Sequence, residues 1–334
     1  MRIRLLSNLP NLGQVAREGV DVEHVEYPYT TAGRPAAFRA LWRSLNCDYA
    51  VINCSPLELV VLCATQYLWP FSKCKIVSLD TVLPVPRLDS FRDRVVLQIK
   101  RLLFTRVHLF IEYFREVDGY VRHYGMPAEK FRYIPFKINR YERVLKTPVS
   151  DGGYIFCGGN TRRDFATLFA AVRDLPYPVR VVTMSDRVIA ENGSYIDGDQ
   201  IPANVELVRH DGSDSFLDHV AAATLVVLPI RRANISASGI GVYLASMALG
   251  KCVIISEGPS VNGVLPDGAA IVVPPEQPAA LRDAIVRAWT DDVARAAIAR
   301  RGQQYALSLG GEERLCASVL DVLSVDATTR GFHQ

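Results

Sequence analysis

Two segments in the second half of the chain combine small residues with arginines at the start of a predicted helix. The first reads CGGNTRRD, and its Gly158 and Gly159 allow a tight turn between a strand and a helix. Backbone amides left free at such a turn can bind a phosphate, and Arg162 or Arg163 can add positive charge. The alternative is an ordinary strand–helix turn capped by Asp164.

The second segment, NISASGIGVYLAS, places Ser236, Ser238 and Gly239 directly before a helix that begins at Ile240, and Arg231 ends the preceding strand. Two helix starts at one edge of a parallel sheet can hold a diphosphate between them, and a loop after a neighbouring strand can reach the base. The predicted nucleotide-binding residues are Gly158, Gly159, Asn160, Thr161, Arg162, His210, Arg231, Ser236, Ser238, Gly239 and Ile240.

Weaker candidates lie in the first half of the chain. Asp80, Glu112 and Tyr113 each follow the end of a predicted strand, and Asn8 and Gly13 lie in the loop after the first strand. In a doubly wound fold these loops line the ligand cleft, so the five residues are candidates for acceptor contacts. The competing explanation is an ordinary turn or cap, where polar residues are common.

Short apolar runs alternate with helical patterns, which is typical of a parallel sheet covered by helices on both faces. The predicted strands are Ile3–Leu6, Tyr49–Asn53, Lys75–Leu79, Leu109–Ile111, Tyr133–Ile134, Tyr154–Cys157, Val179–Thr183, Val205–Val208, Leu225–Leu228, Val253–Ile255 and Ile271–Val273. The predicted helices are Ala36–Leu45, Leu57–Leu68, Asp164–Arg173, Ser215–Ala223, Ile240–Leu249, Pro278–Trp289, Asp291–Ser308 and Glu312–Leu323.

A length of 334 residues suits two domains of about 150 to 170 residues each. The segment KTPVSDGG at Lys146–Gly153 is the predicted hinge, because it is rich in proline, glycine and polar residues. The sequence therefore predicts two Rossmann-like α/β domains that face each other across a cleft. Residues 1–146 form the predicted acceptor domain and 147–310 the nucleotide-sugar domain, and a helix and tail at 311–334 can cross back to the first domain.

The charge is unevenly distributed. Residues 1–150 hold 22 Lys/Arg against 14 Asp/Glu, whereas residues 151–334 hold 16 against 21. A basic half indicates either an anionic partner or a solvated face. Much of the excess lies in Arg87–Arg106, a predicted amphipathic helix that can rest on anionic lipid or pack its apolar stripe into its own domain, and the second is favoured. The stripe is Phe91, Val95, Ile99, Leu102 and Leu103.

Several classes of protein are disfavoured. Seven cysteines without a C-x-x-C pair, and histidines without metal-ligand spacing, argue against a disulfide framework and a zinc site and favour a reducing cytoplasm. The N-terminus lacks the pattern of a signal peptide, and the uncharged stretch 233–250 is a poor membrane span. A nicotinamide dehydrogenase is disfavoured because no G-x-G-x-x-G with a downstream acidic residue occurs.

Three blocks of the second half share a specific pattern. A G-G-x-x-x-R-D-F-x-T-L turn is followed by P-x(8)-S-G and M-A-L-G-K-x-V-I, and then by D-G and V-P-P. Their order and spacing, from Gly158 to about Ala284, resemble the donor domain of family-4-type glycosyltransferases with the glycosyltransferase-B fold. The matching residues are Gly158, Gly159, Arg163, Asp164, Phe165, Thr167, Leu168, Pro229, Ser238, Gly239, Met247–Lys251, Val253, Ile254, Asp267, Gly268 and Val273–Pro275.

The resemblance implies a glycosyltransferase of polysaccharide biosynthesis. Its donor is a nucleotide-diphosphate sugar of the UDP or GDP type, and its acceptor is a saccharide or a lipid-linked saccharide. Retaining chemistry without a metal or other cofactor is implied, with Asp80 and Arg231 as the predicted catalytic residues. We expect a cytoplasmic protein without a nucleic-acid partner. Arg87–Arg106 is the candidate segment for peripheral contact with the anionic inner face of the membrane, the less favoured of its two interpretations.

One departure from the family pattern supports a second hypothesis. Family-4 enzymes commonly carry two glutamates eight positions apart that flank the donor-site helix, and Ala237 and Ala245 stand at those positions here. An alanine side chain cannot accept a hydrogen bond from a ribose hydroxyl. The alternative is therefore a non-catalytic nucleotide-sugar-binding or scaffold protein of a glycan assembly complex.

Overall fold

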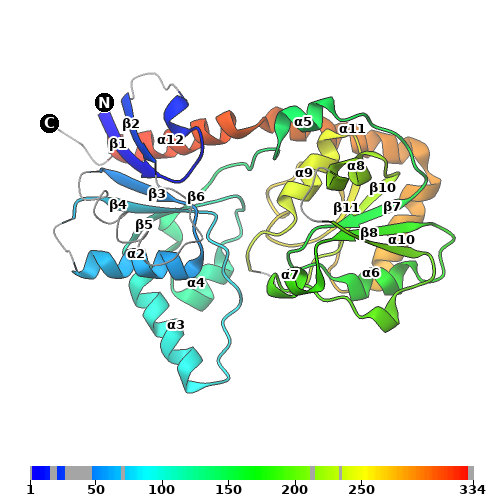
Figure 1. Ribbon diagram of the computed structural model, residues 1–334, viewed down its shortest axis with the longest axis horizontal. Helices are drawn as coiled ribbons and strands as arrows, with labels where there is room; N and C mark the ends of the chain where they lie inside the picture. The colour runs from blue at the N-terminus through cyan, green and yellow to red at the C-terminus, as the bar shows by residue number, and fades with distance from the viewer. Residues whose placement is uncertain are drawn as a thin grey trace. The chain divides into compact units, whose positions relative to one another are not determined.

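The computed structural model describes residues 2–15, 21–26, 47–68, 72–210, 215–232 and 235–329, with the backbone alone for 21–26. The predicted helix Ala36–Leu45 lies outside these residues. The chain forms two compact units, one from Met1–Pro135 with Glu312–Gln334 and the other from Phe136–Gly311 (Figure 1). Lys146, where the sequence places the end of the first domain, lies at the end of a helix inside the second unit.

The first unit holds a parallel sheet of six strands in the order β2-β1-β3-β4-β5-β6. This is a flavodoxin-like order, which reverses direction between β1 and β3. The strands are β1 (Arg2–Ser7), β2 (Asp21–Glu26), β3 (Tyr49–Ile52), β4 (Lys75–Leu79), β5 (Val107–Glu112) and β6 (Phe131–Tyr133). The α-helices are α2 (Pro56–Leu68), α3 (Phe91–Phe104), α4 (Asp118–Tyr124) and α12 (Glu312–Thr329).

The second unit holds another parallel six-stranded sheet, in the order β12-β11-β10-β7-β8-β9. This is the Rossmann order, with its switch point between β7 and β10. The strands are β7 (Ile155–Gly158), β8 (Val179–Thr183), β9 (Val205–Arg209), β10 (Leu225–Leu228), β11 (Cys252–Ser256) and β12 (Ile271–Val273). The helices are α5 (Tyr141–Lys146), α6 (Phe165–Val172), α7 (Asp186–Glu191), α8 (Ser215–Ala221), α9 (Ile240–Ala248), α10 (Pro278–Thr290) and α11 (Asp292–Leu309). The predicted α/β class with two Rossmann-like sheets is confirmed.

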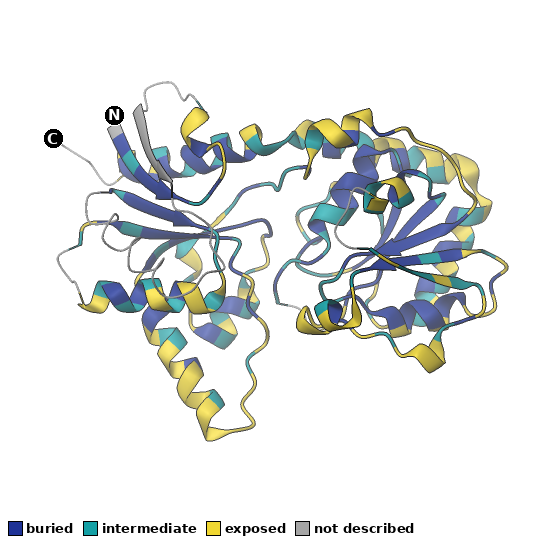
Figure 2. Ribbon diagram, viewed as in Figure 1, coloured by how far each residue is buried: buried dark blue, intermediate teal, exposed yellow. Residues whose placement is uncertain are grey.

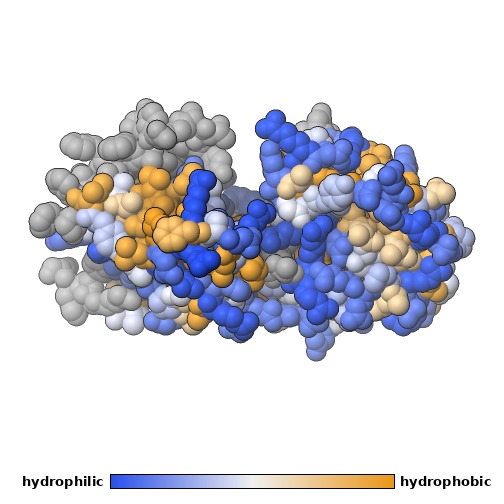
Figure 3. All heavy atoms as spheres, turned by 90° about the horizontal axis from the view of Figure 1, so that it is seen from below, coloured by the Kyte–Doolittle hydropathy of each residue, from blue (hydrophilic) through white to orange (hydrophobic). Residues whose placement is uncertain are grey.

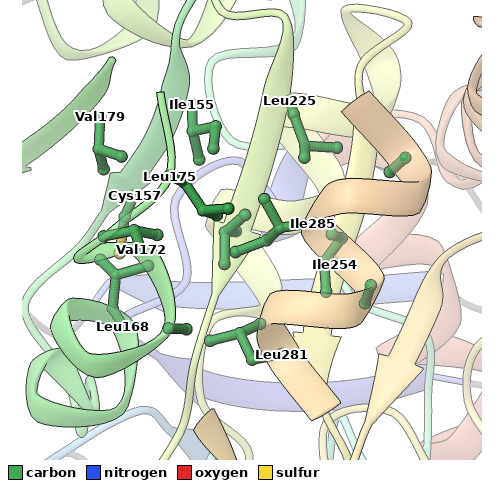
Figure 4. Packing of buried hydrophobic residues seen from close by; sticks show 14 of the residues in the cluster. Ile155, Cys157, Leu168, Val172, Leu175, Val179, Leu225, Ile254, Leu281 and Ile285 are labelled. Carbon is green, nitrogen blue, oxygen red and sulfur yellow. The ribbon is translucent and has the colours of Figure 1, made fainter. Parts of the chain in front are cut away.

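Burial on both faces explains the apolar runs of the second sheet. Alternate residues of its central strands pack against Leu168 of α6 and Ile285 of α10 (Figure 4). The residues between them point to the other face, where the Phe156 ring meets the Phe216 ring of α8 edge to face, with centroids 5.4 Å apart. A strand covered on both sides needs apolar residues throughout, which is why its sequence shows no alternation.

Helix α12 returns the chain to the first unit. Its Asp326 accepts hydrogen bonds near the amino ends of three strands, from Tyr49 Oη at 2.9 Å, His108 Nε2 at 2.8 Å and Lys75 Nζ at 3.4 Å. Burial alone would raise the pKa of Asp326, but the bonds from His108 and Tyr49 and the nearby positive charges bring that pKa below its usual value. Asp326 therefore anchors α12 as a carboxylate.

Candidate nucleotide-binding site

A cavity of about 550 Å³ lies entirely within the second unit, at the carboxyl end of its sheet. The loops after β7 and β10, which border it, leave the sheet in opposite directions at the switch point, where doubly wound folds bind ligands. The lining residues are Asn139, Arg140, Val144, Gly159, Asn160, Thr161, Arg163, Met184, Val188, Asn192, His210, Phe216, Leu217, Gly239, Gly241, Val242 and Ala245.

The turn after β7 requires glycine at Gly159. Its φ of +98° is in the left-handed region, and a Cβ there would stand 2.6 Å from Arg163 Nη2 and 3.3 Å from Val242 Cγ2. Absence of a side chain lets the backbone lie directly against the guanidinium and the start of α9. The turn, the arginine and the helix thus form one packed wall of the cavity.

Arg163 is the central charged group of this wall, and only 1% of it is exposed. Its Nε donates to the Gly158 carbonyl at 2.8 Å, and Nη1 donates to the Thr161 carbonyl at 2.9 Å and to Ser238 Oγ at 3.4 Å. All three acceptors are neutral, and no carboxylate of the described residues pairs with the guanidinium. Burial lowers the pKa of Arg163, but an arginine keeps its proton, so the wall carries a positive charge that no described carboxylate compensates.

Several predicted ligand side chains serve instead to fix the loops around Arg163. Asn160 Oδ1 accepts from the Met184 amide at 3.0 Å, and Ser238 Oγ donates to the Thr161 carbonyl at 2.7 Å. Asp164 caps α6 through bonds from the amide and hydroxyl of Thr167, at 3.1 and 2.6 Å. These bonds hold the β7 and β10 loops in register, which leaves the ligand contacts to backbone amides and to Arg163.

The start of α9 forms the adjacent wall. Gly239, its N-cap residue, has a φ of +85° and makes no side-chain cap. The Val242 amide donates to the Gly239 carbonyl at 3.1 Å, which leaves the amides of Ile240 and Gly241 without an acceptor among the described residues. Gly239, Gly241 and Val242 all line the cavity. A Cβ on Gly241 would lie 2.9 Å from Asn139 Nδ2, so the segment before α5 also approaches this helix start. Helix amides beside an arginine favour an anion.

The chemistry of the lining suits an anion with an apolar part. Arg140 and Arg163 supply positive charge, and none of the described lining residues is an aspartate or glutamate. Asparagines contribute amides that can both donate and accept hydrogen bonds. The apolar lining residues are Val144, Met184, Val188, Phe216, Leu217, Val242 and Ala245. A nucleoside diphosphate has matching parts: two phosphates, a ribose and a flat base.

Five of the eleven predicted nucleotide-binding residues line the cavity: Gly159, Asn160, Thr161, His210 and Gly239. Arg231 is exposed, and its backbone amide donates to the Arg162 carbonyl at 3.2 Å. Arg231, Gly158, Arg162, Ser236, Ser238 and Ile240 are not among the described lining residues. The sequence predicts Arg162 and not Arg163 as a ligand, because two adjacent arginines do not show which of them is buried. Asn139 and Arg140 were missed because they are distant in sequence.

The first unit buries acidic groups at the carboxyl ends of β4 and β5. Glu112 is fully buried, and both of its carboxylate oxygens lie 3.1 Å from the Thr81 amide, which donates to them. Burial, and secondarily the charge of Asp80, raises the pKa of Glu112 well above its ordinary value. Burial also raises the pKa of Asp80 to about 6. Tyr113 beside them is buried too, and burial raises its pKa.

The remaining candidates of the first unit lie in the loop after β1. Asn8 bridges to the loop after β3, accepting from the Asn53 amide at 2.9 Å and donating to the Asn53 carbonyl at 2.5 Å. Its amide group thus ties together the two loops at the switch point of this sheet. Gly13 is exposed in a short 3-10 helix, Leu12–Gln14.

Two searches of the described residues are negative. They contain no group of three or more His, Cys, Asp and Glu side chains that could hold a metal ion. None of the helices among them is both long and apolar enough to cross a membrane.

Residues 163–291, all within the second unit, match the family model described as glycosyl transferases group 1. Among curated proteins, none matches the sequence significantly. Solved structures share the fold. The Anabaena protein HepE, in complex with UDP and glucose, superposes with a TM-score of 0.66 at 16% identity, over 91% of this chain and 86% of that one.

Two further structures are similar. The sucrose-phosphate synthase of Thermosynechococcus elongatus has a TM-score of 0.61 at 18% identity, over 98% of this chain and 89% of that one. The α,α-trehalose 6-phosphate synthase of Burkholderia multivorans has a TM-score of 0.60 at 12% identity, over 90% of this chain and 77% of that one. At these identities the structures show the glycosyltransferase-B fold. The family model adds that residues 163–291 of the second unit form a glycosyl transferases group 1 domain.

Proposed function

We propose that the protein transfers a sugar from a nucleotide-diphosphate sugar, of the UDP or GDP type, to a saccharide or lipid-linked saccharide acceptor. The observation that carries this proposal is Arg163, a buried guanidinium that lines the cavity at the switch point and pairs with no carboxylate in the described part of the chain. HepE was crystallised with UDP and with UDP-glucose, and the shared fold makes such a donor the first choice here.

In the proposed mechanism, the second unit acts on the leaving group. As the bond between the sugar and the diphosphate breaks, negative charge grows on the departing phosphate oxygen. Arg163 and the first-turn amides of α9 stabilise the transition state, where that charge has grown, more strongly than they stabilise the bound donor. This difference lowers the barrier. No step needs a metal ion, because the arginine and the amides supply the positive charge. A family-4-type donor domain with retaining stereochemistry is part of the proposal.

We assign the acceptor to the first unit, with Asp80 as the group that takes the proton from the acceptor hydroxyl. Asp80 directly follows β4 with a φ of +54°, and its pKa of about 6 leaves it ionised at neutral pH while still able to accept a proton. The reaction rate should therefore fall as the pH drops through about 6. An unchanged rate down to pH 5 or below would exclude this role for Asp80.

The experiment that tests the main proposal separates binding from turnover. Titration calorimetry with UDP, GDP, dTDP and CMP and their sugars should show one preferred nucleotide. Release of that nucleotide from its sugar, with or without an added saccharide acceptor, should follow. Tight binding without any turnover across acceptors would favour the non-catalytic alternative, which the alanine at position 245 in the cavity wall supports. No binding of any nucleotide would overturn both.

The proposed location is the cytoplasm, because all seven cysteines are free thiols and a protein of the cytoplasm keeps them reduced. Burial raises the pKa of Cys63, Cys74 and Cys157 each to about 12, so these thiols are not reactive. Peripheral attachment to the inner face of the membrane through Arg87–Arg106 completes the proposal.

A further inference from the structure

Helix α3 presents apolar side chains to solvent. Its Phe91, Val95, Ile99 and Leu102 are exposed, with exposed fractions from 39% for Val95 to 79% for Phe91 (Figure 2). These four residues, here called the outer stripe, follow one another at spacings of four, four and three, so they lie on one side of the helix. The sequence favours packing of Phe91, Val95, Ile99, Leu102 and Leu103 into the domain. The structure buries only Leu103 of these five, so the expectation is wrong for the four residues of the outer stripe.

Most of the face that does pack, formed by Leu97 and Phe104, is opposite to the outer stripe, and Leu103 lies at the border between the two. The buried residues of α3 are Leu97, Leu103 and Phe104. Leu97 is two positions from both Val95 and Ile99, which is about 200° around a helix. The helix therefore has two apolar faces, and its own unit covers only one of them. Figure 1 shows why, since α3 extends away from the sheet of the first unit.

The exposed apolar surface is concentrated around this helix. Of the 18 exposed large apolar residues among those described, 12 fall between Leu57 and Leu102. Tyr67 of α2 extends the outer stripe at its far end, where its hydroxyl donates to the Leu102 carbonyl at 3.2 Å. Seen from below, apolar atoms gather on the first unit beside strongly hydrophilic ones (Figure 3). Such a concentration marks an interaction surface.

Charge identifies what this surface contacts. Arg92 and Arg94 are exposed on either side of the outer stripe, and the segment Arg87–Arg106 holds six basic and two acidic residues. One acid, Asp93, is occupied by the capping box of α3, where it accepts from the amide and hydroxyl of Ser90. A groove of about 350 Å³ beside the helix is also lined by Arg87 and Lys100. Apolar residues flanked by arginines match an anionic bilayer surface.

We infer that the outer stripe of α3 inserts into the interface of an anionic membrane, with Arg92 and Arg94 on lipid headgroups. This deepens the peripheral attachment proposed above by assigning it a face and an insertion mechanism. It does not depend on the donor site, because every residue of the surface lies in the first unit and none lines the nucleotide cavity.

Vesicle sedimentation tests the inference. The whole protein is mixed with vesicles of phosphatidylcholine alone, or of phosphatidylcholine with phosphatidylglycerol. We expect binding to the anionic vesicles at least about tenfold stronger than to the neutral ones, weakening as salt rises. The variant Ile99→Ser/Leu102→Ser should lose about tenfold or more by removing the inserted groups, and Arg92→Gln/Arg94→Gln should lose a similar factor through charge.

Matched controls come from the second unit. Val293→Ser removes a side chain that is 81% exposed, and Arg300→Gln removes an exposed arginine, so both should bind vesicles as the wild type does. All variants should keep their melting temperature and nucleotide affinity, which separates a failure here from a failure of the donor-site proposal. Absent binding, equal binding to both vesicles, or binding unchanged in the outer-stripe variant would overturn the inference. So would a dimer in light scattering that the outer-stripe variant disrupts, because the surface would then be a protein interface.

Discussion

The two units bury opposite charges at equivalent places. At the carboxyl end of its sheet, the second unit buries the Arg163 guanidinium against neutral oxygens. At the carboxyl end of the other sheet, the first unit buries the Glu112 carboxyl, whose described contacts include the Thr81 amide and no cation. Among the described residues of its own unit, neither group meets an opposite charge, although burial makes each charge costly.

The two groups differ in how the free-energy cost of burying their charge can be removed. A carboxyl escapes the cost of burial by taking up a proton, which is what the raised pKa of Glu112 expresses. An arginine has no such escape at any pH at which proteins fold, because its guanidinium stays protonated. The first unit can therefore neutralise its buried group by protonation, whereas the described residues of the second unit offer Arg163 no such neutralisation. This difference supports the proposal that the second unit binds the anionic donor.

The largest expected effect comes from removing that charge. Arg163→Gln should weaken UDP binding on the order of a hundredfold, because a charge-assisted contact contributes roughly 1.5–3 kcal/mol and the β7 and β10 loops lose their brace. Arg163→Lys should bind with intermediate affinity, since it keeps the charge without the planar fork. Titration calorimetry measures both, with Arg300→Gln as the control. Wild-type affinity in Arg163→Gln would place the diphosphate elsewhere.

A smaller effect is expected where the first unit does pair its charges. Asp326→Asn should lower the free energy of unfolding by roughly 2 kcal/mol at neutral pH, because three donors lose a charged acceptor. The pKa of Asp326 is lower in the folded state, so its stabilising contribution is present above the unfolded pKa and is lost as the pH falls through the folded pKa. Denaturant titrations at several pH values should show the two proteins converging in acid. The exposed Asp267→Asn is the control, and a constant difference would contradict the anchor role.

Neutralising Glu112 should raise the free energy of unfolding, whereas neutralising Asp326 lowers it. Its pKa is raised in the folded state, so the native protein holds the proton more tightly and stability falls as the pH rises from the unfolded pKa to the folded one. Glu112→Gln should remove that loss and raise the free energy of unfolding at about pH 8 by roughly 1 kcal/mol. Thermal unfolding across the pH range measures it, with exposed Glu313→Gln as the control. If Glu112→Gln instead destabilises the protein at high pH, the ionised Glu112 carboxylate stabilises the folded state.

The smallest effect is expected at Arg231. The sequence predicts a diphosphate contact here, but the side chain is exposed and outside the cavity-lining set. Arg231→Gln should change UDP affinity by less than about threefold, because an exposed charge is screened by solvent. A loss of UDP affinity of tenfold or more by calorimetry would show that Arg231 contacts the nucleotide, which would contradict Arg163 as the main positive charge at the site.

The sequence was most informative where burial is complete. Strand β10 matches its predicted bounds because a short, unbroken apolar run favours a buried strand. Strand β8 also matches its predicted bounds, although Arg180 interrupts its apolar residues. Strand β2 escaped prediction because DVEHVE intersperses charges, and α4, α5 and α7, of six or seven residues, are too short to display a helical period. The sequence of α3 shows an apolar stripe but not whether other residues cover it. The pair Arg162 and Arg163 shows two charges but not which of them is buried. Both depend on contacts between distant segments.

The return of α12 to the first unit has a consequence for synthesis on the ribosome. Residues 136–311 are contiguous, so the second unit has all its elements as soon as this stretch has emerged. The first unit can complete its contacts only later, because Tyr49 donates a hydrogen bond to Asp326, which is translated 277 residues after it. At typical elongation rates that interval is roughly 15 to 55 s. The unit whose synthesis begins first is thus the last to be completed, and until then the residues that pack against α12 remain without it.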